Sequence, residues 1–136
     1  PHAERLNVVL KLELPEQSII IDADPYRLTQ VITNLIGNAL KHTRHDSNVI
    51  IQVASDDDRV LIDVIDHGAG IAKEHLEKLF QPFYQASDDQ TGVGLGLAIV
   101  QEIVKAHGGD ISVESEIDTG TTFHIQLPLV QKTPDA

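Results

Sequence analysis

Apolar residues occupy alternate positions between Asn7 and Leu14, with lysine and glutamate between the leucines. A period of two is typical of a β-strand that is covered on one face. The segment Pro15-Glu16-Gln17 predicts a turn, and Ser18 to Ile21 is a second short apolar run. We therefore expect the chain to open with an antiparallel β-hairpin.

The pattern then changes to that of a helix. Asp24-Pro25 combines a carboxylate that can cap a helix with a proline at the first helical position. Beyond them the apolar residues recur at steps of three and one, which gathers them into one stripe along the helix. The helix should end between Lys41 and His45, because basic side chains suit the negative end of its dipole. The stripe consists of Leu28, Val31, Ile32, Leu35, Ile36, Ala39 and Leu40.

The rest of the chain predicts four further strands, a short amphipathic segment and a second long helix. The helix from about Leu97 to Ala106 should stop at His107-Gly108-Gly109, because glycine commonly ends helices. The acidic triplet Asp56-Asp57-Asp58 fits a solvated hairpin tip better than a metal site. The strands span Val49 to Val53, Val60 to Ile65, Ile111 to Val113 and Phe123 to Leu127, and the amphipathic segment spans Lys73 to Leu79.

This order of elements predicts the fold class. Helices gathered in the middle of the chain, between mostly antiparallel strands, are typical of a two-layer α/β sandwich. We expect a mixed, mostly antiparallel sheet of about five strands with three helices on one face. With 136 residues, of which 41% are hydrophobic, the chain suits one domain with one core.

Composition restricts the possible functions. The absence of cysteine excludes disulfides, thiolate metal sites and cysteine nucleophiles. A net charge of −11, with only ten scattered lysines and arginines, argues against a nucleic-acid-binding surface. Because the sequence contains neither a long apolar run nor a signal-peptide pattern, we expect a soluble, cytoplasmic domain.

Asn34, Asn38 and Lys41 share one stripe of the predicted helix, beside its apolar face, because they lie four and three residues apart. Amide oxygens there can bind a hard cation such as Mg²⁺, and an ammonium group can meet a phosphate. A solvent-facing border of the helix is the alternative interpretation of this spacing.

Asp66 ends a strand, and by parity its side chain points to the same face as the apolar residues between Val60 and Val64. A carboxylate there is costly to bury unless a donor pairs with it, and the exocyclic amine of adenine is such a donor. Gly68 and Gly70 follow, where a flat ring could approach the backbone closely. An aspartate followed by two glycines is also common in turns.

The glycine-rich segment from Gly92 to Leu97 runs straight into a helix, so its N–H groups form a candidate anion site. The segment matches neither the P-loop nor the dinucleotide-binding motif. None of the seven histidines has metal-ligand spacing, and His124 should point outward from the last strand. No serine nucleophile arrangement is visible.

Taken together and in this order, the segments resemble the Bergerat-type ATP-binding fold shared by histidine kinases, DNA gyrase, Hsp90 and MutL, and most closely its histidine kinase branch. The resemblance covers about residues 7 to 128. Four spaced motifs in one order are far more specific than any single motif. The matching segments are DADPYRLTQVITNLIGNALKHT, DHGAGI, LFQPFYQ, GVGLGLAIV and TGTTF.

The resemblance implies a role for each matching residue. Asn38 would be the Mg²⁺ ligand, with Asn34 near the metal and phosphates and Lys41 on the phosphates, and these three residues would form the catalytic set. Asp66 would accept from the adenine amine, and Gly68 and Gly70 would border the base. The resemblance also implies a lid anchored by Phe80 and Phe83 and hinged at Gly92, Gly94 and Gly96, and nucleotide contacts from Ile71, Val93, Leu95, Leu97 and Thr122.

Some positions depart from the family pattern. His67 stands where asparagine is usual, and Val93 where threonine is frequent. The lid from Gln85 to Thr91 has two aspartates and no basic residue, so the resemblance does not extend to a phosphate contact from the lid. Asn34 stands where gyrase-like ATPases have the glutamate that activates water, and an amide is no general base near neutral pH.

We therefore expect a protein-histidine kinase domain that binds ATP and Mg²⁺ and donates the γ-phosphate to a histidine in a separate dimerisation domain. Because the dimerising helical domain is expected before residue 1, the domain alone should be a monomer. No histidine of the chain has the acidic context of the acceptor, so the domain alone should not autophosphorylate. A response regulator receiver domain would take the phosphoryl group next. An anti-sigma-type serine kinase and a degenerate, non-catalytic nucleotide-binding module are the alternatives, and the resemblance leaves open whether the inner membrane anchors the parent protein.

Overall fold

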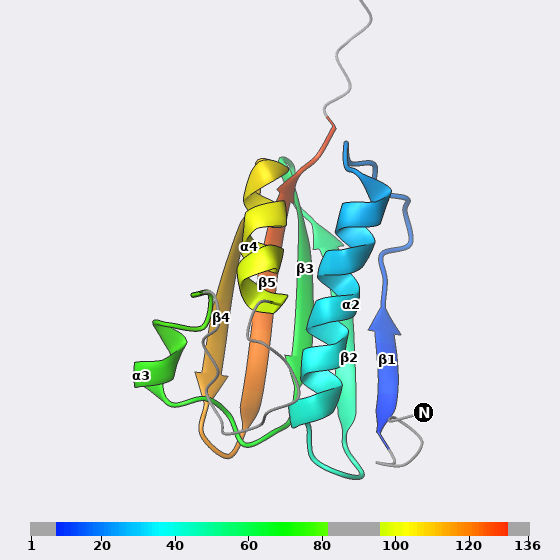
Figure 1. Cartoon of the computed structure of the whole chain (residues 1–136). Coiled ribbons are helices and arrows are strands. Elements are labelled where there is room, and N and C mark those ends of the chain that lie inside the picture. The colour runs from blue at the N-terminus through cyan, green and yellow to red at the C-terminus, as the bar shows by residue number, and fades with distance from the viewer. Residues whose placement is uncertain (1–7, 82–95, 131–136) are drawn as a thin grey trace, which may run out of the picture.

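The computed structural model describes residues 8–81 and 96–130, which form a five-stranded sheet in the order β1-β2-β3-β5-β4. Helices α2 and α4 cover one face of the sheet, and the short α3 lies beside β4 (Figure 1). The predicted two-layer α/β sandwich is confirmed. The elements are β1 (Val9–Glu13), α2 (Pro25–His42), β2 (Asn48–Ser55), β3 (Arg59–Asp66), α3 (Lys73–Leu76), α4 (Gly96–Ala106), β4 (Asp110–Glu116) and β5 (Gly120–Pro128).

The predicted hairpin at the start of the chain is wrong. Residues 18–21 form no strand, and β1 pairs in parallel with β2, with Leu10 opposite Val49 and Leu12 opposite Ile51. Parallel strands need a long crossover connection, and α2 provides it. An alternating pattern fits a strand of either direction, so the pattern could not distinguish the hairpin from the crossover.

β1 is an edge strand whose five residues are all exposed. Val8, just before it, is buried, whereas Leu10 is 43% exposed and Leu12 is 60% exposed. The alternation along β1 therefore does not mark a buried face.

Helix α2 begins where the sequence predicts. The Asp24 carboxylate accepts hydrogen bonds from the N–H groups of Tyr26 (3.0 Å) and Arg27 (3.3 Å), and Pro25 follows at the first helical position. Three residues of the predicted stripe form the buried centre of the helix, and the rest pack partly buried around them. The buried three are Val31, Leu35 and Ala39.

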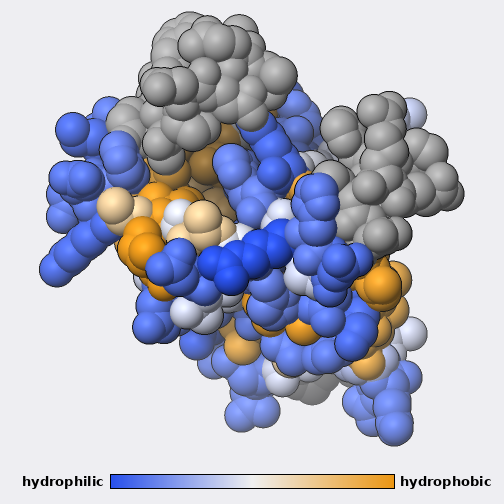
Figure 2. Space-filling view, turned by 90° about the horizontal axis from the view of Figure 1, so that it is seen from below, coloured by the Kyte–Doolittle hydropathy of each residue, from blue (hydrophilic) through white to orange (hydrophobic). Residues whose placement is uncertain are grey.

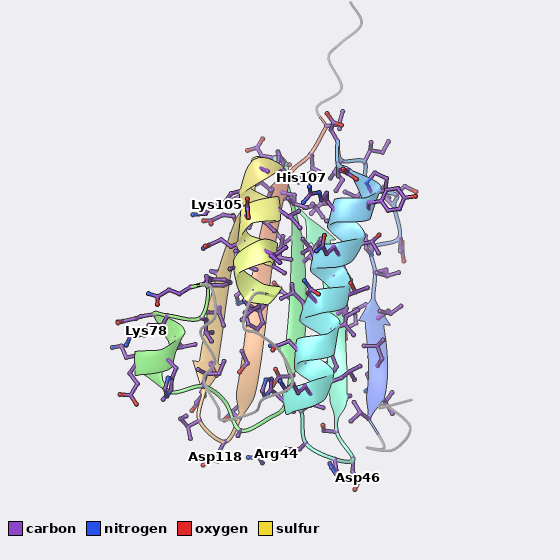
Figure 3. All side chains as sticks on the ribbon, in the orientation of Figure 1. Arg44, Asp46, Lys78, Lys105, His107 and Asp118 are labelled. Atoms are coloured by element: carbon purple, nitrogen blue, oxygen red, sulfur yellow. The ribbon has the colours of Figure 1, made fainter. Side chains whose placement is uncertain are left out.

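Helix α4 also stops at the predicted glycines. The N–H of Gly109 donates to the carbonyl of Val104 at 3.0 Å, and Gly108 has a φ of +78°, which glycine adopts readily. His107 lies beside the start of α2 (Figure 3), where its Nε2 accepts from the N–H of Asp24 at 3.0 Å. The two helices that cover the sheet are therefore joined at this end.

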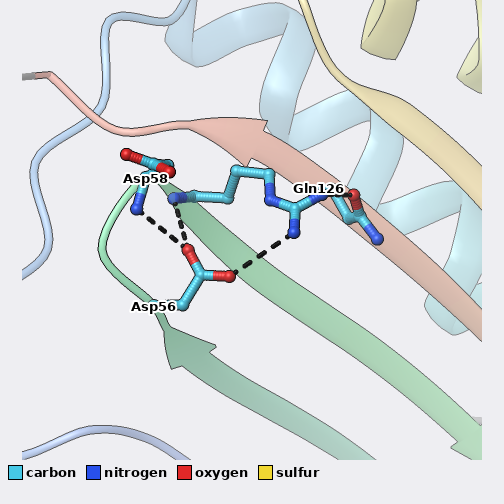
Figure 4. A network of polar contacts seen from close by, with 4 residues as sticks. Asp56, Asp58 and Gln126 are labelled. Atoms are coloured by element: carbon cyan, nitrogen blue, oxygen red, sulfur yellow. Dashed lines mark hydrogen bonds and ion pairs between the residues drawn. The ribbon is translucent and has the colours of Figure 1, made fainter.

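The acidic triplet is the exposed tip of the β2–β3 hairpin, as predicted. One Asp56 oxygen accepts from the N–H groups of Asp58 (2.9 Å) and Arg59 (2.8 Å), and the other lies 3.6 Å from the Arg59 guanidinium (Figure 4). These contacts, led by the N–H of Asp58, lower the pKa of the Asp56 carboxyl. The carboxylate of Asp56 thus organises its own turn.

His124 points to the face of the sheet that the helices leave open, as predicted. Its Nδ1 lies 2.6 Å from the carboxylate of Asp63 on β3, and its Nε2 lies 3.3 Å from that of Glu114 on β4. The three side chains join neighbouring strands on the face opposite the helices.

The packing of α2 predicts how two leucines differ in their contribution to stability. Leu35 is fully buried, so Leu35→Ala should lower the free energy of unfolding by about 2–5 kcal/mol. Leu12→Ala, the matched control on β1, should cost less than about 1 kcal/mol because that side chain is 60% exposed. Urea unfolding measures both, and equal losses would contradict the difference in burial between Leu35 and Leu12.

Candidate functional site

Asp66 is the buried acid at the end of β3. It is 4% exposed, and its Oδ1 accepts hydrogen bonds from the N–H groups of Gly68 (3.0 Å) and Thr121 (3.2 Å). Its side chain points to the helix-covered face, in line with Val64, so the prediction from parity is confirmed. Burial raises the pKa of this carboxyl, against the opposing effect of the two N–H bonds.

The loop after Asp66 is held between the end of α2 and the turn that joins β4 to β5. The Thr43 hydroxyl accepts from the N–H of His67 at 3.1 Å, and the N–H of Arg44 donates to the His67 carbonyl at 3.3 Å. On the other side, the N–H of Asp118 donates to the carbonyl of Ala69 at 2.7 Å. The guanidinium of Arg44 also lies 3.6 Å from the Asp118 carboxylate at this end of the molecule (Figure 3).

His67, which departs from the family pattern, has a structural role. Its Nδ1 lies 2.7 Å from the carbonyl of Asn48, at the start of β2. The imidazole therefore joins the loop to the neighbouring strand, and this contact explains how a histidine is accommodated there.

The two glycines of the loop are needed for contacts within the protein itself. A Cβ on Gly68 would lie 2.0 Å from the His42 carbonyl oxygen, and a Cβ on Gly70 would lie 2.3 Å from that of Glu116. Gly70 also has a φ of +81°, which disfavours other residues. Glycine is therefore required because α2 and β4 approach the loop, and the expected contact with a base stays a prediction.

The polar stripe of α2 lies on the half of the helix that leads to this loop. Asn34 and Asn38 are half-buried and Lys41 is exposed, and Thr43, which caps the helix, contacts the loop. Residues 8–81 and 96–130 contain no group of three histidine or acidic side chains arranged to hold a metal. The oxygen ligands that this stripe itself offers are the side-chain amides of Asn34 and Asn38.

Apolar residues lie around the same end of the sheet. The ring of Phe80 packs edge-on against Phe123, with ring centres 6.4 Å apart. Ile71 and Leu97 are half-buried and pack against the core. Seen from this end, hydrophobic side chains show among mostly hydrophilic ones (Figure 2).

Of the predicted glycine-rich segment from Gly92 to Leu97, the structure describes only Gly96 and Leu97. Gly96 is the first residue of α4 and is exposed. The second lid anchor and most of the glycine-rich segment lie outside the described residues. These are Phe83, Gly92, Val93, Gly94 and Leu95.

The structure separates Thr122 from the site and places Thr121 in it. Thr122 is opposite Ile65 and points to the open face, whereas Thr121 is opposite Asp66 and is 5% exposed on the helix-covered face. The Ser115 hydroxyl lies 2.8 Å from that of Thr121. Sequence reasoning missed both Thr121 and Ser115, although counting by twos from Phe123 would have found Thr121.

The buried carboxyl predicts a pH dependence of stability. Between the ordinary pKa of 3.8 and the raised pKa of Asp66, the folded protein binds a proton that the unfolded chain has released. The stability contributed by this group therefore falls as the pH rises through that interval. Asp66→Asn keeps an oxygen for both N–H groups but does not titrate. The free energy of unfolding of this variant minus that of the wild type should therefore increase with pH from about 3.8 upward.

Urea unfolding of both proteins over a pH series tests this dependence. A difference that shrinks as the pH rises would mean that the fold favours the ionised carboxylate, which contradicts the dominant effect of burial.

Comparison with known proteins identifies the family. Residues 23–131 match the family described as "Histidine kinase-, DNA gyrase B-, and HSP90-like ATPase". The alginate biosynthesis sensor protein KinB of Pseudomonas aeruginosa is 37% identical over 129 residues, covering 95% of this chain and 22% of KinB. The sensor histidine kinase WalK of Bacillus subtilis is 39% identical over 128 residues, covering 90% of this chain and 21% of WalK. The chain thus spans about a fifth of the length of these relatives.

Two solved structures of histidine kinases are also similar to this chain. The catalytic domain of histidine kinase ThkA has a TM-score of 0.81 at 30% identity, covering 93% of this chain and 83% of that one. Full-length ShkA in complex with AMPPNP has a TM-score of 0.85 at 31% identity, covering 98% of this chain and 28% of that one. Neither the serine kinase nor the non-catalytic module gains support from these matches. The chain therefore belongs to the family of histidine kinase-, DNA gyrase B- and HSP90-like ATPases and is homologous to the catalytic domains of sensor histidine kinases.

Proposed function

We propose that this domain binds ATP with Mg²⁺ and presents the γ-phosphate for transfer to a histidine in a separate helical dimerisation domain of a sensor kinase. The observation that carries the proposal is the buried Asp66, 4% exposed, with one oxygen held by two N–H groups beside the end of α2. Family membership and the relatives named as sensor kinases support it.

Asp66 would recognise the adenine. Its Oδ1 already accepts two hydrogen bonds, so Oδ2 is the atom that can accept from an exocyclic amine. A buried carboxylate gains from such a donor because it has lost its water. The apolar side chains of Ile71, Phe80 and Leu97, all half-buried, would contact the faces of the ring.

The α2 stripe would hold the metal and the phosphates. Mg²⁺ keeps several waters and needs only one or two protein ligands in addition to phosphate oxygens, which fits the amides of Asn38 and Asn34. When bound, Mg²⁺ neutralises charge on the transferring phosphate. In a chain of net charge −11, the attraction for an anion must be local, and we assign it to Lys41 and the N–H groups at the start of α4.

The residues of the site favour transfer over hydrolysis. Asn34 cannot take a proton from water near neutral pH, so water would attack slowly. The domain's own contribution is to position the nucleotide so that a histidine brought from elsewhere can attack in line. A response regulator receiver domain would then take the phosphoryl group from that histidine.

No helix in the described residues is long and apolar enough to cross a membrane. We propose a cytoplasmic location for the domain, where ATP is available.

Titration calorimetry with ADP and a non-hydrolysable ATP analogue, with and without Mg²⁺, tests the site. Asp66→Ala should lower the affinity for both nucleotides about tenfold to a hundredfold, because a hydrogen bond to a charged group is lost. Asn38→Ala should remove the gain in affinity that Mg²⁺ gives. Asp63→Ala, the control on the open face of β3, should bind as the wild type does. A wild-type domain without affinity for either nucleotide would refute the proposal.

Labelling with γ-³²P-ATP tests the reaction. The domain alone should stay at background, and label should appear on a helical dimerisation domain from a related sensor kinase when the two are mixed. The Asn38→Ala variant should not transfer label. Strong self-labelling of the isolated domain would show that the acceptor lies within this chain and would overturn the assignment.

A further inference from the structure

Three polar side chains form one row across the helix-covered face of the sheet. Asp66 on β3 is opposite Thr121 on β5, and Thr121 is opposite Ser115 on β4. The strands β3, β5 and β4 lie side by side in this order (Figure 1). The preceding row on the same face is apolar, with Phe123 between Val64 and Val113. The polar row therefore closes the core at the end of the sheet where the site lies.

The hydrogen bonds of Ser115 determine where its proton and that of Thr121 lie. The Ser115 hydroxyl lies 2.7 Å from the Ile71 N–H, 3.0 Å from the Gly120 carbonyl oxygen and 2.8 Å from the Thr121 hydroxyl. A serine hydroxyl has one proton to donate and two lone pairs. The N–H can only donate and the carbonyl can only accept, so Ser115 accepts from Ile71 and donates to Gly120. The remaining lone pair of Ser115 then accepts the proton of Thr121.

The orientation of the Thr121 proton leaves only acceptors in the row. Because the Thr121 hydroxyl donates its hydrogen bond to Ser115, it can only accept further hydrogen bonds. An ionised Asp66 carboxylate also only accepts. Thr121 is 5% exposed and Asp66 is 4% exposed, so bulk water has little access to reorient either group.

We propose that Ser115 is a positioning residue for base selection: by holding the Thr121 proton, it keeps the row an acceptor surface for the 6-amino group of a purine. This inference rests on the proposed nucleotide function and deepens it. A 6-oxo purine places a carbonyl oxygen against the same acceptors, where no proton is available to pair with it. A site built to bind an amine rejects an analogue that leaves its buried polar groups unpaired.

Ser115→Ala removes the acceptor that holds the Thr121 proton, and the freed hydroxyl can donate to a 6-oxo group. The probes are ADP and inosine diphosphate, which differ in the 6-substituent and in the proton at N1. Calorimetry should find that the wild type prefers ADP, and that Ser115→Ala reduces the ratio of the two affinities by roughly fivefold to tenfold. Ser115→Thr keeps a hydroxyl at this position and should restore the ratio.

Two controls separate positioning from general damage. Ser112→Ala removes a hydroxyl from the open face of the same strand and should leave the ratio unchanged. In a Thr121→Val background, Ser115→Ala should cause no further change in the ratio, because the proton it would release is absent. Thr121→Val alone removes one acceptor of the row and should also reduce the ratio. It leaves the Ser115 hydroxyl and its bonds to Ile71 and Gly120 in place, so the inference stays testable even where Ser115→Ala is poorly folded.

The outcomes distinguish this inference from the proposed function. If the wild type prefers ADP and Ser115→Ala lowers the affinity for both diphosphates equally, the role of Ser115 is overturned and the nucleotide site stands. A wild type that binds neither diphosphate would overturn both.

Discussion

The arrangement of this domain depends on the two hydrogen bonds that the Asp66 carboxylate accepts from the N–H groups of Gly68 and Thr121. One bond turns the chain sharply after β3, and the other joins that turn to β5. A buried acid without these donors would be strongly destabilising, so the sheet end, the loop and the carboxylate can exist only together. The same two bonds use one carboxylate oxygen, Oδ1, and leave Oδ2 for the proposed contact with adenine.

The loop after Asp66 is held by contacts with three separate elements. The end of α2 contacts it through Thr43, and the β4–β5 turn contacts it through Asp118. β2 contacts it through the Asn48 carbonyl, which accepts from the His67 imidazole. The glycines permit this crowding, since carbonyl oxygens of α2 and β4 occupy the space where a Cβ would lie. These contacts hold the loop without a ligand, which would reduce the ordering cost of binding at the proposed site.

The helix and the sheet bring different chemistry to the same end of the molecule. Where β3 and β4 end and β5 begins, the sheet carries a row of oxygen-bearing side chains, Asp66, Thr121 and Ser115, suited to a neutral donor such as an amine. Helix α2 contributes half-buried amides and an exposed ammonium, which suit a cation and a phosphate. In the proposed function, this division would let an acidic protein of net charge −11 attract a nucleotide through a few positive groups placed near the phosphates.

The sequence by itself determined the features that depend on neighbouring residues. The Asp24-Pro25 cap and the apolar stripe defined α2, the glycines after His107 ended α4, and alternation along β3 placed Asp66 on the covered face. Each of these follows from a period or a capping bond that spans only a few residues.

Tertiary structure decided what depends on pairing between distant segments. Alternation identified β1 as a strand but could not show that α2 would cross over and make it parallel to β2. Register alone placed Thr121 rather than Thr122 beside Asp66, and it brought Ser115 to the same row. Counting by twos from Phe123 puts Thr121 on the helix-covered face, but only the pairing of β3 with β5 sets it opposite Asp66.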